Sequence, residues 1–389
     1  MDEMRRYRIV IGSKQYFDNY VASEFNDVSL DISSSFSYMI RLNDDARNKN
    51  RGYYVDFEKS EFLLVKNDNY HGIVEQAHDR LGPLIEELTT EDAIIVVHNP
   101  TITLEDYLRG QHLRGLIKLS DECEKHQMMR DKQVFKTCID KISEKIIGQN
   151  NALREVTKSM WYLTCIERKK PFVIMLYGNS SIGKTEMVRQ VASQFFDDKV
   201  TEKHLSMYKT GAYAYELFGD KPNRRSIGFE LLERESNLVF LDEFDKLPND
   251  FFSVFYTLFD NVMFKDSTYR VDISGLLIFL TSNYSSENEM KKHLGLPIYY
   301  RIDKFIRFDD FSADTIHKVT EKEILHCANN SDGQINADVL YNRVSSKLNA
   351  QGENARTIKN AVQREVEDLL FEEIAAIEHE RDVLIQSPQ

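Results

Sequence analysis

The pattern of hydrophobic and polar positions divides the chain into three regions. Between residues 1 and 130, short strand-like runs ("YRIVIG", "EFLLVK", "AIIVVH") alternate with polar turns, and "NDNYHGIVEQAHDRLGPLIEEL" favours helix. Between residues 131 and 310, strand-length runs alternate with helical stretches, as in a parallel sheet covered by helices. From Ser312 onward the apolar spacing is helical almost throughout. We therefore predict a separate N-terminal α/β domain (1–130), an α/β core (131–310) and a C-terminal helical domain (311–389).

The clearest helical period lies near the C-terminus, in "ARTIKNAVQREVEDLLFEEIAAIEHERDVLI". Its apolar residues recur at intervals of three and four: Ile358, Ala361, Val362, Val366, Leu369, Leu370 and Ile374. This spacing predicts a helix with one buried face.

Composition and charge narrow the class of protein. The chain has 389 residues, of which 42% are hydrophobic and 29% charged, as in an ordinary globular protein. Apolar runs are too short for a membrane helix, and "MDEMRRYRIV" lacks the apolar core of a secretion signal. The formal charge of −13 disfavours a general grip on nucleic acid or an anionic membrane, although it leaves a local basic patch possible. The scattered cysteines (Cys123, Cys138, Cys165 and Cys327) argue against a zinc cluster or disulfide framework and favour a cytoplasmic location.

The stretch "GNSSIGKT" fits the phosphate-binding pattern G-x-x-x-x-G-K-[ST] between a strand-like run and a helix. Glycines at both ends let successive N–H groups point at phosphate oxygens, and the following helix adds its positive end. Lys184 is expected to reach the terminal phosphates, and the Thr185 hydroxyl to bind Mg²⁺. The predicted nucleotide-binding residues here are Gly178, Asn179, Ser180, Ser181, Ile182, Gly183, Lys184, Thr185 and Glu186.

Two further apolar runs end in polar residues that suit nucleotide hydrolysis. In "NLVFLDEFDKL", four apolar residues precede Asp242 and Glu243, which a parallel sheet would place at its carboxyl edge. We expect Asp242 to hold Mg²⁺ and Glu243 to polarise the attacking water. In "SGLLIFLTSNYSS", Asn283 is either a turn residue or a partner of the water or γ-phosphate.

Taken together, these motifs make the chain resemble an AAA+ ATPase, specifically the ATPase module of Clp unfoldases and most closely their second ring. The resemblance covers about residues 142–370. Beyond the shared phosphate loop and "LDE", it is carried by "IIGQNNA" (146–152), "LDEFDKLPNDFFSVFYTLFD", "TSN" (281–283), "YRID" (300–303) and "NARTIKNAVQ" (354–363). It implies a parallel AAA+ sheet between helices, a C-terminal helical lid, and ATP with Mg²⁺ as cofactors.

The resemblance also assigns roles to single residues. Ile146 and Ile147 match the residues against the adenine base, although apolar residues there also suit helix packing. Asn283 matches the sensor asparagine, and Arg356 the sensor arginine of the lid helix. Arg301 matches the arginine that reaches into a neighbouring subunit's nucleotide, with Arg307 as the next arginine along the segment. The resemblance therefore implies a homo-oligomeric ring or spiral, usually a hexamer.

The segment that matches the Clp pore loop departs from the family pattern. The Clp pore loop carries an aromatic residue that grips threaded polypeptide, whereas the matching stretch, 217–236, has "PNRRS" at 222–226. Tyr215 and Phe229 flank this stretch out of the expected position. The paired arginines, Arg224 and Arg225, suit either an acidic ligand or phosphate backbone, or a solvated turn.

Two functions follow for the whole chain. The first is a protein-remodelling ATPase ring of Clp type, which recognises its protein partner through the N-terminal domain. The second is an ATP-driven switch or assembly platform that controls an effector or a nucleic-acid-bound complex without threading polypeptide. The N-terminal region also contains His71, His78 and His98 near Asp79 and Asp92, which are more typical of surface and packing positions than of a catalytic site.

Overall fold

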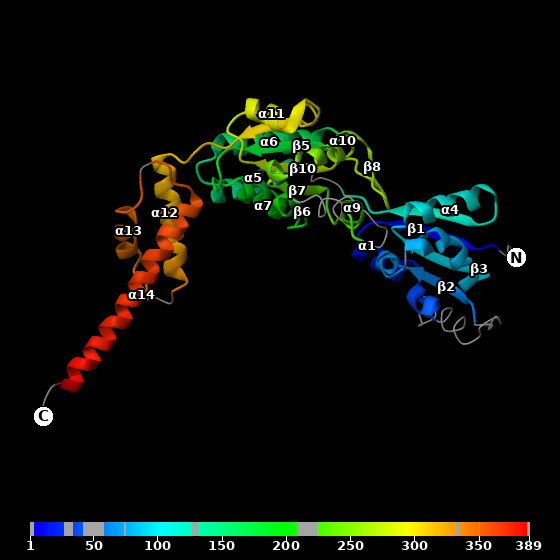
Figure 1. Ribbon diagram of the computed structural model, residues 1–389, viewed down its shortest axis with the longest axis horizontal. Helices are drawn as coiled ribbons and strands as arrows, with labels where there is room; N and C mark the ends of the chain where they lie inside the picture. Colours follow the sequence, from blue (N-terminus) through cyan, green and yellow to red (C-terminus); the bar gives the residue numbers. More distant parts are fainter. Residues whose placement is uncertain are drawn as a thin grey trace.

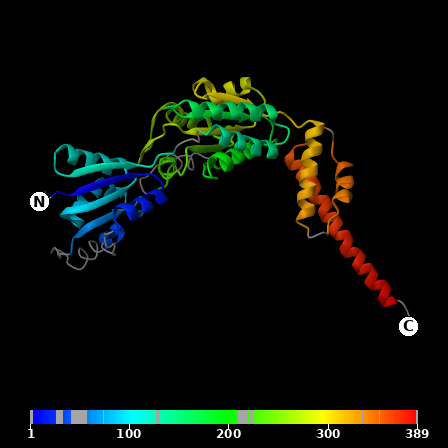
Figure 2. The same cartoon turned by 180° about the vertical axis from the view of Figure 1, so that it is seen from behind.

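Two parallel sheets and a group of C-terminal helices follow one another along the chain, as Figure 1 and the reverse view in Figure 2 show. The computed structural model describes residues 4–26, 34–41, 58–73, 75–126, 131–208, 219, 224–331, 334–349 and 351–386. The predicted fold class is confirmed, since the chain is mixed α/β with parallel sheets flanked by helices. The division at 130/131 and 310/311 stays a prediction.

The N-terminal sheet has four parallel strands in the order β2-β3-β1-β4. Its face toward α1 buries Val10, Phe17 and Val96, and its other face packs on α3 and α4. Because the helices after β1 and β3 cover opposite faces, the carboxyl ends of these neighbouring strands flank a topological switch point. The elements are β1 (Arg6–Ile11), α1 (Lys14–Glu24), β2 (Ser60–Val65), η2 (Asn67–Gly72), η3 (Glu75–Arg80), α3 (Leu81–Leu88), β3 (Thr89–His98), α4 (Ile102–Leu113) and β4 (Lys118–Cys123).

The predicted helix over 67–88 is only partly right. The structure has two 3₁₀ segments, η2 and η3, followed by the α-helix α3. Pro83 lies in the first turn of α3, where a missing N–H costs nothing, whereas a helix continuing from Asp79 would need that N–H. The α-helix therefore begins at Leu81.

The larger sheet has five parallel strands in the order β11-β5-β10-β7-β6. Its inner strands β5 (Phe172–Tyr177), β7 (Leu238–Asp242) and β10 (Leu277–Ser282) are buried along their whole length. Alternate residues of β5 enter two different cores: Val173 and Met175 face α10 and α11, while Ile174 and Leu176 face α7 and α6. This double burial explains why these strands have continuous apolar sequences.

The remaining elements of this region cover the sheet or connect its strands. They are α5 (Lys132–Lys145), α6 (Asn150–Cys165), α7 (Lys184–Phe195), β6 (Thr201–His204), η4 (Leu205–Tyr208), α9 (Ile227–Leu232), η5 (Phe244–Lys246), η6 (Asn249–Phe251), α10 (Phe252–Asp260), β8 (Met263–Lys265), β9 (Arg270–Asp272), α11 (Glu287–Tyr299) and β11 (Lys304–Arg307). Strands β8 and β9 form a separate antiparallel pair.

The C-terminal region is helical, as predicted, with α12 (Ala313–Asn329), α13 (Ala337–Ser345) and α14 (Ala355–Gln386). These helices continue the core on one face of the larger sheet, where Ile358 and Val362 are fully buried. The predicted apolar face of α14 is buried only at its beginning, because Ile374 is 56% exposed. Farther along, α14 extends away from the other helices (Figure 1). Among the described helices, none has the length and apolar character needed to cross a membrane.

Side-chain caps define where many helices begin. Each cap is a short polar residue whose oxygen accepts a backbone N–H of the first turn, which would otherwise be unpaired. The capping residues are Ser13 for α1, Thr101 for α4, Asp131 for α5, Ser226 for α9, Ser286 for α11, Ser312 for α12 and Asn336 for α13.

Candidate active site

The predicted phosphate loop joins the carboxyl end of β5 to the start of α7. Three of its residues have left-handed backbone, with φ of 136° at Gly178, 62° at Ser181 and 104° at Gly183. A Cβ on Gly178 would lie 2.5 Å from the carbonyl oxygen of Phe308, so only glycine fits this position. The loop thus turns sharply at the end of a buried strand and leads directly into the N-terminus of a helix.

Lys184 folds back over this loop. Its Nζ donates to the carbonyl oxygens of Gly178 (2.7 Å) and Asn179 (2.5 Å), and to Oδ1 of Asn283 (3.1 Å). Burial lowers the pKa of Lys184 to about 8, although the carboxylates of Asp245 and Asp242 oppose this shift. The ammonium group is therefore largely removed from water and held by neutral acceptors, which suits exchange of those acceptors for phosphate oxygens.

The two predicted acids lie at the end of β7, beside the loop. Oδ1 of Asp242 lies 3.5 Å from the Thr185 hydroxyl and accepts a short hydrogen bond from Thr281 Oγ1. The backbone N–H of Glu243 donates to the Thr281 hydroxyl (2.9 Å) and to Asp242 Oδ1 (3.2 Å). Glu243 has a left-handed backbone with φ of 57°, a costly conformation for a residue with a side chain. These bonds hold the strand end in that conformation and so set the direction of the Glu243 side chain.

Oxygen donors near the loop fit a hard divalent cation. Thr185 supplies a hydroxyl and Asp242 a carboxylate, and Mg²⁺ prefers one or two such protein ligands with water and phosphate oxygens completing its shell. Mg²⁺ bound there would neutralise charge on the phosphates of ATP. The residues present are therefore compatible with a magnesium nucleotide.

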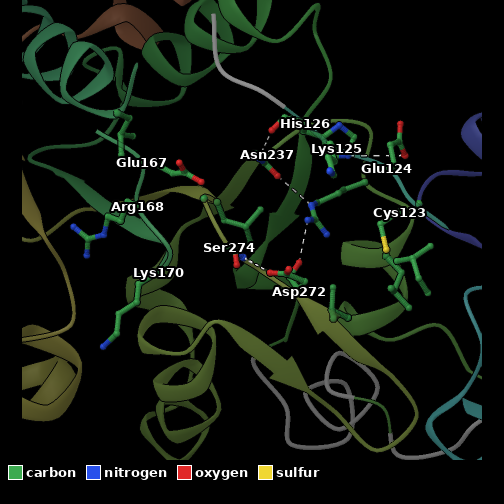
Figure 3. Close-up of a pocket in the computed structure, with 18 of the residues that line it drawn as sticks. Cys123, Glu124, Lys125, His126, Glu167, Arg168, Lys170, Asn237, Asp272 and Ser274 are labelled. Atoms are coloured by element: carbon green, nitrogen blue, oxygen red, sulfur yellow. Dashed lines mark hydrogen bonds and ion pairs between the residues drawn. The ribbon is translucent and has the colours of Figure 1, made fainter. Parts of the chain in front are cut away.

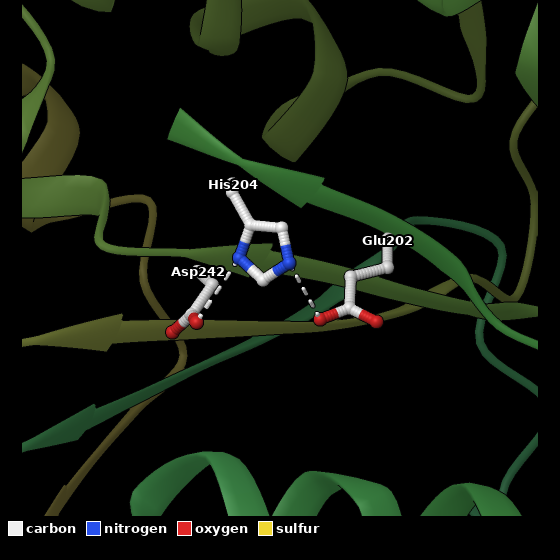
Figure 4. Close-up of side chains that lie close together, drawn as sticks. All are labelled: Glu202, His204 and Asp242. Carbon is white, nitrogen blue, oxygen red and sulfur yellow. Dashed lines mark ion pairs between the residues drawn. The ribbon is translucent and has the colours of Figure 1, made fainter. Parts of the chain in front are cut away.

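His204 is a site residue that sequence reasoning missed. Figure 4 shows its ring between the carboxylates of Glu202, from β6, and Asp242. Nδ1 lies 3.3 Å from Asp242 Oδ2, and Nε2 lies 3.3 Å from Glu202 Oε1. The stretch "TEKH" has no apolar run, so no strand was predicted there. The contact orients the carboxylate that is predicted to hold Mg²⁺.

Gln149 was also missed, because its partners are distant in sequence. Its side-chain amide donates to the carbonyl oxygens of Ile182 (3.1 Å) and Asp309 (2.8 Å), and accepts from the N–H of Asp309 (3.2 Å). Gln149 is buried and ties the phosphate loop to the segment that leads toward α12. The predicted adenine contacts precede it in the chain: Ile146 is buried and Ile147 is half-buried.

The start of α14 touches the phosphate loop. The backbone N–H of Ala355 donates to the carbonyl oxygen of Ser181 (2.9 Å), which brings the adjacent Arg356 to the loop. The Arg356 side chain is exposed, while its backbone N–H donates to Asn354 Oδ1 (3.0 Å). Three predicted segments thus contact the loop or the first turn of α7: the end of β7 through Asp242, the end of β10 through Asn283, and the start of α14 through Ala355.

Two other loop residues have local roles. Ile182 is buried and packs into the core beneath the loop. Glu186 is exposed on the first turn of α7, where its carboxylate accepts from Gln190 Nε2 (2.7 Å).

Arg301 lies at the opposite edge of the sheet. It precedes β11, whose Lys304 pairs with Ile174 near the start of β5, so the loop lies at the other ends of these strands. Its guanidinium donates to the carbonyl oxygen of Pro297 (2.7 Å), stacks over Tyr256 and lies 3.7 Å from an Asp260 oxygen. Arg307, in contrast, pairs with Tyr177 at the loop edge. Arg301 is thus far from the nucleotide site of its own chain.

Part of the predicted pore segment (217, 218 and 220–223), together with Tyr215, lies outside the described residues. Among the residues that are described, Phe229 is buried against Tyr269 and His71. Arg225 forms an ion pair with Asp68 of η2 (3.2 Å). This segment therefore contacts the N-terminal part of the chain.

The N-terminal histidines do not form one site with the nearby acids. His98 ends β3, whereas Asp92 lies near the start of that strand, about 20 Å away at the rise of an extended chain. Asp92 accepts from Thr90, and His71 packs against Phe229. Asp92 and His71 thus have separate local contacts, one at the surface and one in packing.

Comparison with known proteins gives one family and a consistent set of relatives. The family described as "AAA domain (Cdc48 subfamily)" matches residues 169–374. The chaperone protein ClpB of Agrobacterium fabrum is 23% identical over 332 residues, which cover 75% of this chain and 36% of that protein. The mitochondrial disaggregase of Bos taurus is 22% identical over 348 residues, 72% of this chain and 50% of that protein.

A similar fold occurs in a closed-state cryo-EM reconstruction of Hsp104 with ATPγS and FITC casein. The TM-score is 0.53 at 14% identity, with 95% of this chain and 89% of that chain covered. The chain spans about a third of the length of the ClpB relative.

Proposed function

This chain belongs to the AAA domain family of the Cdc48 subfamily, a family of ATPases, and from that premise we propose that it hydrolyses ATP with Mg²⁺ in an oligomeric ring. The resemblance to Clp-type AAA+ proteins that the sequence predicted is confirmed. The observation that carries the proposal is the meeting of three neighbouring strand ends, which contribute Lys184, Asp242 with Glu243, and Asn283.

The division of labour follows from position and charge. Lys184 grips the terminal phosphates, and Thr185 and Asp242 hold Mg²⁺. Glu243 polarises the attacking water, which Asn283 helps to orient. Arg356 reaches the γ-phosphate from the lid helix of the same chain. Arg301, at the other edge of the sheet, completes the site of a neighbouring subunit, where its charge offsets charge developing on the γ-phosphate.

We further propose that the ring remodels a protein partner, which the N-terminal part recognises. The relatives named as a chaperone and a disaggregase support this purpose. A hexamer and a cytoplasmic location are the matching expectations for assembly and place, the latter consistent with four free cysteines.

A second candidate function is an ATP-driven switch that does not thread polypeptide. It is favoured by the described part of the pore segment, where Phe229 is buried and Arg225 is paired with Asp68. Unfolded protein should raise the ATPase rate of a threading ring, whereas DNA or RNA should raise the ATPase rate of a switch that acts on nucleic acid. The two titrations, run on the same preparation, separate the two functions.

The direct test of the nucleotide site is Lys184→Ala. Removing the predicted loop cation should abolish ATP binding, measured by isothermal titration with Mg-ATP. Lys199→Ala is the control, because Lys199 is a surface residue paired with Glu235 at 3.3 Å. Unchanged ATP affinity in Lys184→Ala would refute the proposed site.

A further inference from the structure

The carboxyl edge of the N-terminal sheet is occupied by a side chain from the ATPase part of the chain. Glu233 follows directly after α9, and its carboxylate accepts from three nitrogen donors of the N-terminal part. These are the backbone N–H of Lys14 (2.9 Å), Nδ2 of Asn67 (2.9 Å) and Nδ2 of Asn99 (3.2 Å). One carboxylate thus binds residues that follow the carboxyl ends of β1, β2 and β3.

The groups around Glu233 form a preorganised binding site. Asn67, His98 and Asn99 are each at most 2% exposed. His98 Nε2 bonds the carbonyl oxygen of Gly12 (2.9 Å) and lies 3.8 Å from Glu233 Oε1, while its ring stacks on Phe17. These side chains are fixed by the sheet itself.

The electrostatics of the site suit an anion. Lys14 is the first residue of the 11-residue helix α1, so the positive end of the helix faces the carboxylate. Asn67 and Asn99 supply N–H donors without a compensating charge. The site also lies at the β1/β3 switch point, where open parallel sheets bind their ligands.

We propose that the carboxyl edge of the N-terminal sheet is a carboxylate-binding site and that Glu233 is its internal ligand. The bound carboxylate fastens the N-terminal part to α9, within the segment (217–236) that matches the Clp pore loop. A ligand that competes for this site must bring a carboxylate of its own, and its binding releases α9.

Neighbouring contacts link the same two surfaces. Asn67 Oδ1 accepts from the hydroxyl of Tyr269 (3.2 Å), and the N–H of Ile102 donates to the carbonyl oxygen of Thr268 (2.8 Å). Arg270 reaches Glu105 (3.2 Å) and Asp106 (3.3 Å) of α4. Among these contacts, Glu233 brings the carboxylate to which the side-chain amides of Asn67 and Asn99 donate.

The site borders an open space. A cavity of about 490 Å³ lies beside it, lined by Gly12 and Glu124 on the N-terminal side and by Arg234, next to Glu233, on the other. Figure 3 shows Glu124 among the lining residues on one side of this cavity and Glu167, Arg168 and Lys170 on the other. The cavity thus reaches Gly12, whose carbonyl oxygen accepts from Asn99 at the border of the site.

The test exchanges the donor and the acceptor. In the full chain, Glu233→Gln places an amide opposite Asn67, and Asn67→Asp places a second carboxylate opposite Glu233. Each variant loses a charge-assisted hydrogen bond. Each should therefore accelerate amide hydrogen exchange in 66–72 and 227–233 by about 10-fold or more. The double variant should return to within about 3-fold of the unaltered chain, since the amide introduced at position 233 can then donate to the new carboxylate while Tyr269 keeps its acceptor.

Glu235→Gln is the matched control, because Glu235 is two residues away, exposed, and paired with Lys199. Exchange in α7 of the same samples reports whether the ATPase part is folded. Single variants that exchange like the unaltered chain, or a double variant whose effects simply add, would overturn the proposal. The readout does not depend on ATP hydrolysis, so it is separate from the test of the proposed function.

Discussion

The two parallel sheets of this protein differ in what occupies their carboxyl edges. Both bring polar residues to the carboxyl edge, where a ligand can meet several strand ends. In the larger sheet the edge ends in a glycine loop, and the ammonium group of Lys184 donates to three neutral oxygen acceptors. In the N-terminal sheet the edge is filled by Glu233 of the same chain. Topology therefore determines where a ligand can bind, and the side chains determine whether the chain itself fills that place.

The largest expected effect is that of replacing Arg301, which we propose completes the nucleotide site of a neighbouring subunit. Arg301→Ala should reduce ATP hydrolysis by about 10³–10⁵-fold, the range for arginine fingers in other nucleotide hydrolases. Mixing Arg301→Ala with Lys184→Ala should restore activity, because some interfaces then pair an intact pocket with an intact arginine. ATPase assays of the mixture give the readout.

Co-purification of differently tagged subunits must first show that the two variants assemble together. With mixing shown and no recovery of activity, Arg301 does not act across an interface. Arg307→Ala is the comparison variant, because Arg307 lies at the loop edge of its own chain.

Glu243→Gln separates binding from turnover at the same edge. Loss of the carboxylate should lower kcat by about 10²–10⁴-fold, the usual contribution of a general base, with ATP affinity retained. Single-turnover hydrolysis and equilibrium binding measure the two quantities. Glu235→Gln, on the surface before the other end of β7, should change neither. Normal turnover in Glu243→Gln would remove Glu243 from its assigned role.

Thr281 gives a smaller effect, because it acts through its neighbours. Its hydroxyl bonds the carboxylate of Asp242 and the N–H of Glu243. Thr281→Val keeps the shape and removes both bonds, so kcat should fall about 10-fold, as for other residues that orient metal ligands. Thr281→Ser restores the hydroxyl and should recover most of the rate. Equal losses in the two variants would show that packing, and not the hydroxyl, matters.

The smallest effect tests how the outer strand of the larger sheet is fastened. Hydrogen bonds from Lys158 and Lys304 lower the pKa of Glu155 from 4.5 to about 2. This carboxylate stabilises the fold above pH 4.5 and loses that contribution as the pH falls toward 2. Glu155→Gln should therefore lower the free energy of unfolding by at most about 1 kcal/mol at pH 7, since the pair is partly exposed, and by less at pH 3.

Urea midpoints at the two pH values measure this difference, with Glu144→Gln on exposed α5 as the control. An equal effect at both pH values would exclude the ion pairs as its cause.

In both sheets the sequence predicted the strands that carry an apolar run. Strands β5, β7 and β10 are buried on both faces, so each appears as an apolar run followed by residues with a predicted role in nucleotide binding or hydrolysis. Of the edge strands, β4 ("KLSDEC") is largely exposed and β6 ("TEKH") is mostly half-buried, and neither carries such a run. Periodicity therefore could not identify them.

The candidate site was predicted where one continuous motif carries it. The phosphate loop and the acids after β7 are local patterns, and the structure brings them together. Gln149 contacts Asp309 and Glu233 contacts Asn99, each more than 130 residues away in sequence, and a single sequence contains no local signal for such contacts. Arg301 required the family resemblance, since an isolated arginine after a helix is not informative.

Helix α14 adds a mechanical property to this arrangement. It has 32 residues, and its first N–H, from Ala355, bonds to Ser181 in the phosphate loop. At 1.5 Å per residue the helix is about 48 Å long. A tilt of about 10° at the loop end would move the far end by about 8 Å if the helix stayed straight. A change too small to disturb the loop's own hydrogen bonds is thereby converted into a displacement the size of a side chain or more.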